Sequence, residues 1–98
     1  MHHFMIDMTL PDVPTREFLQ LVPKQRAQVA RLLGERRIIS FSLAVDRSKA
    51  WAMMLAESED EVAAILATFP LRKFMRVDIH RLQFVENAPT LVAHISLN

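Results

Sequence analysis

Residues 49–70 read KAWAMMLAESEDEVAAILATFP, and within them the pattern of a strand gives way to that of a helix. Residues 49–56 are predicted to form a strand, in which side chains two residues apart share a face. One face of this strand is expected to carry Trp51, Met53 and Leu55. Ser58 and Glu61 then have the spacing of a capping box, which predicts a helix start. Apolar residues follow at helical spacing, namely Val62, Ile65, Leu66 and Phe69, and we expect Pro70 to end the helix.

A second strand precedes this one, because residues 36–45 read RRIISFSLAV and also alternate. We predict that one face carries Ile39, Phe41, Leu43 and Val45, and that the other carries Ile38, Ser40, Ser42 and Ala44. The residues between the two strands, Asp46-Arg47-Ser48, are typical of a turn, so the two strands form a hairpin.

The N-terminal third predicts a strand, a loop and a helix. Residues 4–10 alternate, with Phe4, Ile6 and Met8 on one side, and Pro11 and Pro14 then enforce a loop. Thr15 can cap a helix, and Gly34 is a candidate for its C-terminal stop. The apolar stripe between them comprises Phe18, Val22, Val29 and Leu33, with Arg26 completing it. Pro23 leaves two possibilities open, one long kinked helix or a second helix that begins there.

The fourth strand is predicted over residues 74–85, with Met75, Val77 and Ile79 facing one way and Arg76, Asp78 and His80 the other. The apolar tail, 90–98, is a candidate for one more short strand. The element order is therefore β-α-β-β-α-β, the ferredoxin-like plan of the α+β class. We expect a single domain over 1–98, with its core in 3–86 and a tail, 87–98, that is open to exchange with a partner subunit.

In this plan two helices cover one face of a four-stranded antiparallel sheet, and the first and last strands lie side by side. The other face is bare, so it must be solvated, hold a ligand or pack against another subunit. We predict Met5, Ile38, Met54 and Leu82 on that side. We therefore expect two sheets to pack face to face as a dimeric α/β barrel, in a homodimer or a higher homo-oligomer.

Composition excludes several function classes. The chain has no Cys and a single Gly, which excludes thiolate metal sites, Cys nucleophiles and Gly-rich phosphate loops. Lys and Arg number 12 against 11 Asp and Glu, a balance that argues against partners such as nucleic acid or a membrane surface. No stretch reaches the ~18 apolar residues of a membrane span, and no signal peptide is visible, so we expect a cytoplasmic protein.

The bare face gathers ionisable residues from two neighbouring strands. These are His3 and Asp7 from the first strand and Arg76, Asp78 and His80 from the last, with Ser40 and Ser42 from the second strand. Carboxylates and imidazoles on a half-enclosed apolar sheet can move protons on and off carbon near neutral pH. The competing interpretation is a solvated polar face with no site. A metal site has little support, because the ligands lack a tight motif.

Several motifs together resemble a known family. They are the opening Phe4-Met5-Ile6-Asp7-Met8, the helix spacing, and Phe69-Pro70-Leu71 followed after two residues by Phe74-Met75 and then Val77-Asp78-Ile79. From about Phe4 to Glu86 the chain resembles the muconolactone delta-isomerase family, where the central motif reads like Leu-Pro-Leu-x-x-Tyr-Met. Two places differ from that pattern. Lys24-Gln25-Arg26 lacks a first-helix carboxylate, and Ser40 and Ser42 replace bulky aromatic or imidazole side chains.

The resemblance implies a small oligomeric enzyme that isomerises an unsaturated, carboxylated lactone in aromatic-compound degradation without a cofactor. Such a reaction needs a base for the ring proton and a cation or hydrogen-bond donors for the dienolate oxygen. We predict that Asp7 or Asp78 moves the proton with His80. Arg76 or Ser40 would hold the charge, with His3 also at the substrate. Two alternatives stay open, a non-catalytic dimeric ligand-binding or interaction module and a cofactor-free monooxygenase-like barrel.

Overall fold

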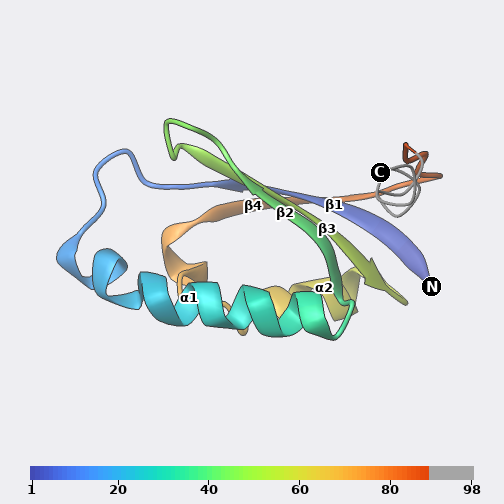
Figure 1. The fold of residues 1–98 in the computed structure, drawn as a ribbon, viewed down its shortest axis with the longest axis horizontal. Coiled ribbons are helices and arrows are strands. Elements are labelled where there is room, and N and C mark those ends of the chain that lie inside the picture. The colour runs from blue at the N-terminus through green and yellow to red at the C-terminus, as the bar shows by residue number, and fades with distance from the viewer. Residues whose placement is uncertain (89–98) are drawn as a thin grey trace, which may run out of the picture.

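The computed structural model describes residues 1–88. Its elements are, in order, β1 (His2–Thr9), α1 (Arg16–Gly34), β2 (Ile38–Leu43), β3 (Lys49–Ala56), α2 (Glu59–Leu66), the 3-10 turn η1 (Arg72–Phe74) and β4 (Arg76–Arg81). The strands form one antiparallel sheet in the order β2-β3-β1-β4, and both helices lie on the same side of it (Figure 1). The predicted ferredoxin-like α+β fold and its strand order are thereby confirmed. The predicted strand over 90–98 lies outside the described residues.

β1 lies in the middle of the sheet, between β3 and β4. Its side chains Phe4, Ile6 and Met8 are buried under the helices, as their alternation predicted. β3 faces the same core with three alanines and Met54, all buried. Met54 was expected on the bare side, and this was wrong because the neighbouring Met53 holds the outward position in the alternation.

α1 is one continuous helix of 19 residues that runs through Pro23, so no second helix begins at that proline. The Phe18 amide donates to the Thr15 hydroxyl at 3.1 Å, which confirms the predicted cap. The buried face consists of Phe18, Gln25, Val29 and Leu32. The prediction placed Arg26 and Leu33 on the buried face instead, and both are exposed. Gln25 was not predicted on this face because it is polar. In the structure the Leu71 amide donates to its side-chain oxygen at 3.0 Å, which satisfies that atom in the core.

α2 begins as the capping box predicts. The Glu61 amide donates to the Ser58 hydroxyl at 3.2 Å, and the Glu61 carboxylate accepts from the Glu57 amide at 3.3 Å. The helix ends at Leu66, earlier than the predicted end at Pro70. Phe69 is nevertheless buried, because the turn after the helix carries it into the core.

β2 contains a bulge that its alternation concealed. Ile38 is paired with Met54, whereas Ser40 is paired with Met53, so Ile39 is the extra residue. Ile38 therefore faces the helices and is 1% exposed, while Ile39 is 43% exposed. Both residues were predicted on the opposite sides. Beyond the bulge Phe41 packs against the core and Ser40 and Ser42 face outward, as predicted. Leu43 and Val45, predicted on the face of Phe41, are 53% and 103% exposed, because the strand ends at Leu43 and Val45 belongs to the hairpin turn.

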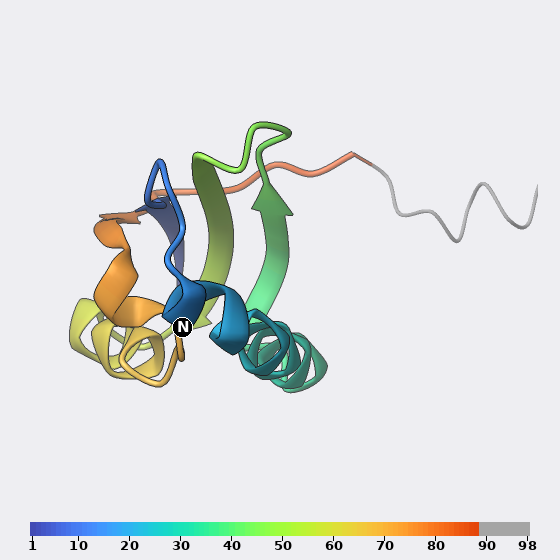
Figure 2. The same cartoon turned by 90° about the vertical axis from the view of Figure 1, so that its left-hand side faces the viewer.

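β4 is shorter than the predicted 74–85, because Phe74 belongs to η1 and the last paired residue is Arg81. The Leu82 amide still donates to the His3 carbonyl at 2.9 Å. Beyond it the described chain runs away from the sheet (Figure 2). Leu82, expected on the bare face, thus lies just past the end of the strand.

The hairpin between β2 and β3 is closed by an Asp46 turn. The Ser48 hydroxyl and amide donate to the Asp46 carboxylate at 2.7 and 2.9 Å. These two hydrogen bonds, the hydroxyl's first, hold the pKa of Asp46 below its ordinary value of 3.8. The turn also places Arg47 at a positive φ of 63°.

The end of α1 is a Schellman motif without glycine. The Arg36 amide donates to the Leu33 carbonyl and the Arg37 amide to the Leu32 carbonyl, at 3.1 and 3.0 Å. This bond pattern puts Arg36, with φ 60°, at the left-handed position that glycine usually takes. Gly34, the predicted stop, is instead the last helical residue.

Replacing Arg36 with glycine should stabilise the protein, because a side chain at positive φ costs about 1 kcal/mol that glycine avoids. We expect the melting temperature of Arg36→Gly to rise by roughly 4–8 °C for a domain of this size. Arg37→Gly, one residue on at negative φ, is the matched control and should lower it. An unchanged or lower melting temperature for Arg36→Gly would contradict the assigned backbone strain.

Candidate active site on the open sheet face

The sheet face away from the helices is ordered into rows that run across the strands. The pairing places two complete rows side by side, Ser42–Trp51–Asp7–Asp78 and Ser40–Met53–Met5–His80. A third row, next to the first, contains Lys49, Thr9 and Arg76. Neighbouring strands are about 4.8 Å apart, so adjacent members of a row are in contact range.

Two carboxylates lie directly opposite each other on this face, where the inner strand β1 pairs with the edge strand β4. Asp7 on β1 is the register partner of Asp78 on β4, which sets their Cβ atoms about 5 Å apart. Like charges in this position repel each other. Lys49 offsets one of the two charges, since its Nζ lies 2.7 Å from Asp7 Oδ1. That oxygen accepts no well-aligned hydrogen bond, so the contact is an ion pair.

The two carboxylates differ in their surroundings. The Asp7 side chain is 29% exposed and is held between Lys49 and the neighbouring strands. Asp78 is exposed on the edge strand, and within residues 1–88 no cationic group lies within 4 Å of its carboxylate. The pair therefore contains one neutralised carboxylate and one free carboxylate.

Arg76 and His80 flank Asp78 along β4. Each is two residues from Asp78 and therefore projects from the same face, about 7 Å away along the strand. Both are exposed. Arg76 and Lys49 lie on the same side of the carboxylate pair, because both belong to the row of Thr9, next to the row of Asp7 and Asp78. The cations thus gather at one end of the pair and the imidazole at the other.

The structure does not bring His3 and Ser40 into this group. His3 is four residues from Asp7 on the same strand, roughly 13 Å away, and it is paired with Leu55. Ser40 is in the row of His80 but three strand spacings away, roughly 14 Å. Neither distance allows a direct contact with a small molecule seated on Asp78.

Sequence reasoning missed Lys49 and did not assign Trp51 to the site. Both project from β3 onto the open face, and Trp51 is the register partner of Asp7 on the side away from Asp78. The indole is 37% exposed and forms an apolar wall beside the carboxylates. The signal was present in the alternation of 49–56, because the buried alanines at 50 and 52 force their neighbours outward.

In residues 1–88 no three His, Cys, Asp or Glu side chains lie close enough together to hold a metal ion. No helix of that part combines the length and apolar character needed to cross a bilayer.

The model of one protein family, muconolactone delta-isomerase, matches residues 2–87. The chain belongs to the muconolactone delta-isomerase family. This confirms the resemblance carried by the Phe69-Pro70-Leu71 stretch and its flanking strands. No curated protein matches the chain in sequence.

Two solved structures have the fold of this family member. A muconolactone isomerase is 18% identical with a TM-score of 0.69, and the match covers 90% of this chain and 99% of the isomerase. A 5-chloro-2-hydroxyhydroquinone dehydrochlorinase from Burkholderia phenoliruptrix, in complex with 2,5-dihydroxybenzoquinone, is 17% identical with a TM-score of 0.62. That match covers 85% of this chain and 95% of the dehydrochlorinase. At these identities the likeness establishes the fold.

Removing the charge of Asp78 should stabilise the fold, since it relieves the repulsion across the β1–β4 pair. We expect Asp78→Asn to raise the free energy of unfolding by roughly 0.2–1 kcal/mol at neutral pH and low salt. The gain should shrink in 1 M salt, where screening weakens the repulsion. Urea denaturation at both ionic strengths measures this. Asp12→Asn, in an exposed loop, is the control, and an equal gain there would contradict the assignment.

Proposed function

We propose that the protein is a cofactor-free isomerase that moves a proton within a small unsaturated, carboxylated lactone. Membership of the muconolactone delta-isomerase family supports the reaction class. The observation that carries the proposal is the unequal carboxylate pair, in which Lys49 neutralises Asp7 and leaves Asp78 free. Two carboxylates in different surroundings can take different roles in one reaction.

Asp78 is the proposed base. Its carboxylate takes a proton from a ring carbon, and the electron pair of the broken C–H bond moves toward the lactone carbonyl to form a dienolate. Lys49 and Arg76, gathered at one end of the carboxylate pair, hold the negative charge that develops on the oxygen. The protonated Asp78 then returns the proton to the distal ring carbon, either directly or through His80, which passes on one proton as it receives the proton of Asp78. Substrate and product have the same formula, so the step needs no oxidant or reductant.

A second copy of the chain is part of the proposal, because proton transfer through a dienolate is favoured where water is excluded. On one chain the face is open, and it exposes Trp51 beside the half-buried Met5 and Met53. Two such faces packed about 10 Å apart would bury these apolar side chains and enclose the charged rows. A homodimer or higher homo-oligomer would therefore complete the site.

Catalysis by this face predicts a selective loss of turnover. With muconolactone as substrate and ultraviolet absorbance as readout, we expect Asp78→Asn and His80→Gln to lower kcat by roughly 10²–10⁴-fold. Asp12→Asn should stay within twofold of the wild type. Because Asp78→Asn is expected to be at least as stable as the wild type, its loss of activity would not reflect unfolding.

The proposed reaction is contradicted if the wild-type protein shows no turnover above the uncatalysed rate at high concentration. If wild type, Asp78→Asn and His80→Gln have equal turnover, the reaction does not take place on this face. One of the structures sharing this fold is a dehydrochlorinase in complex with a dihydroxybenzoquinone, so hydroxylated quinones belong in the same assay.

Assembly predicts that the wild-type chain elutes at twice 11.3 kDa or more in size-exclusion chromatography with light scattering. Trp51→Glu should shift this mass toward the monomer, because it places a charge in the apolar centre of the proposed interface. Val45→Glu is the matched control, since Val45 is fully exposed on the hairpin turn, and it should leave the mass unchanged. A wild-type monomer would overturn the assembly.

A non-catalytic homo-oligomeric module is the second candidate. It is favoured by the exposure of Asp78 and His80 on the edge strand, where solvent reaches both. In that case the same face serves only as an interface. A stable oligomer without turnover on any lactone or quinone would support it.

A further inference from the structure

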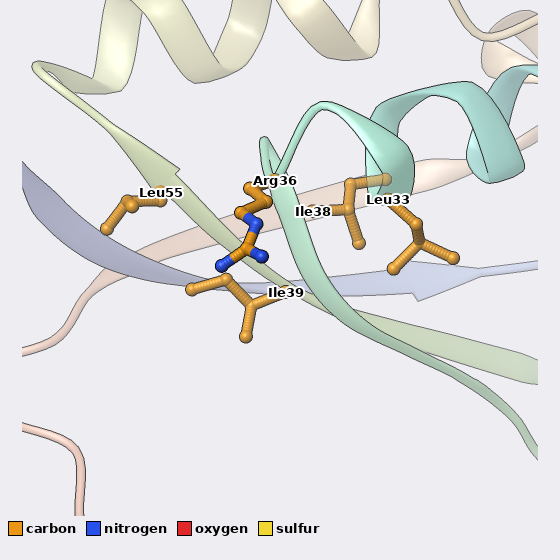
Figure 3. Close-up of a pocket in the computed structure, with 5 residues that line it drawn as sticks. All are labelled: Leu33, Arg36, Ile38, Ile39 and Leu55. Atoms are coloured by element: carbon orange, nitrogen blue, oxygen red, sulfur yellow. The ribbon is translucent and has the colours of Figure 1, made fainter.

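A cleft lies at the other edge of the sheet, where α1 turns into β2. It measures about 360 Å³ and is lined by Leu33, Arg36, Ile38, Ile39 and Leu55 (Figure 3). Four of these five side chains are aliphatic, and the bulge at Ile39 shapes one wall. The cleft is a shallow, half-open groove that combines an apolar surface with a single charged group, a composition that small-ligand sites share.

Arg36 is the charged group, and among residues 1–88 it is in no ion pair. Its neighbours Arg31 and Arg37 both pair with Glu35, at 2.7 and 3.7 Å. Within residues 1–88 no carboxylate lies within 4.0 Å of the Arg36 guanidinium. In Figure 3 this guanidinium points toward Ile39, with Leu55 to its left and Leu33 farther to its right across the ribbon.

The backbone at Arg36 makes arginine an unfavourable residue for this position. The residue has φ 60° at a helix-stop position where glycine costs least. Stopping the helix does not require a guanidinium, and an arginine here carries strain that a glycine would not.

We propose that this cleft binds a small amphipathic carboxylate, such as an aryl or aliphatic acid. The guanidinium of Arg36 would take the carboxylate through two parallel N–H···O hydrogen bonds. The ring or chain would lie against Ile39, Leu55 and Leu33. The subsite is separate from the open-face carboxylates, because Leu55 lies four residues from Trp51 along β3, roughly 13 Å. It goes beyond the proposed isomerase activity and does not depend on it.

The test uses the full chain labelled with ¹⁵N and benzoate as the probe. In two-dimensional NMR titrations we expect shifts at the backbone amides of 36–39 and 55, with saturation in the millimolar range, because the guanidinium is exposed. Benzamide, which has the same shape without the charge, should bind at least fivefold more weakly. Arg36→Gly should lose the response by a similar factor while melting at a higher temperature, so the loss would not reflect unfolding.

Arg37→Ala is the matched control, since Arg37 lies next in the chain but pairs with Glu35, and it should bind benzoate as the wild type does. Equal binding of benzoate and benzamide, or equal binding by Arg36→Gly and wild type, would overturn the proposal. Shifts confined to the amides of 7 and 76–80 would also overturn it, by placing the carboxylate on the open face. A chain that binds benzoate at the cleft without isomerising lactones would refute only the proposed reaction.

Discussion

The one-sided burial of β1 places Asp7 on the open face, and the pairing with β4 then sets Asp78 opposite it. Phe4, Ile6 and Met8 are almost fully buried, and each contributes roughly 1.5–3 kcal/mol through the apolar surface it removes from water. Slipping the strand by one residue would exchange these side chains for the opposite face. The repulsion between Asp7 and Asp78 amounts to about 1 kcal/mol or less. The free energy of burying these apolar side chains therefore exceeds the repulsion, and the strand keeps the register that sets the two carboxylates opposite each other on the open face.

Most of the fold followed from periodicity, and the errors have physical causes. The faces of β1 and the capped start of α2 were predictable because their patterns are regular. The bulge in β2 was invisible, since Ile38 and Ile39 are equally apolar and either fits the core. Gln25 was missed because a polar residue enters the core only with a hydrogen-bond partner, and that partner, Leu71, is 46 residues away in the chain.

The candidate site was predictable where it depends on topology. The strand order placed Asp7, Asp78, Arg76 and His80 together once the two outer faces were known. The sequence did not show how far apart residues lie across the sheet. Ser40 shares a row with His80, but it lies three strand spacings away. The ion pair of Lys49 depends on a diagonal contact between β3 and β1, which no pattern within a single strand reveals.

The bulge at Ile39 also affects how the chain behaves at high concentration. β2 is one rim of the sheet, and an irregular ladder there offers an incoming strand no even row of amide and carbonyl groups. The other rim, β4, has six residues and carries four ionisable side chains, Arg76, Asp78, His80 and Arg81. Short, charged rims discourage fibril growth. A protein that leaves apolar side chains on an uncovered sheet is thereby protected from polymerising edge to edge.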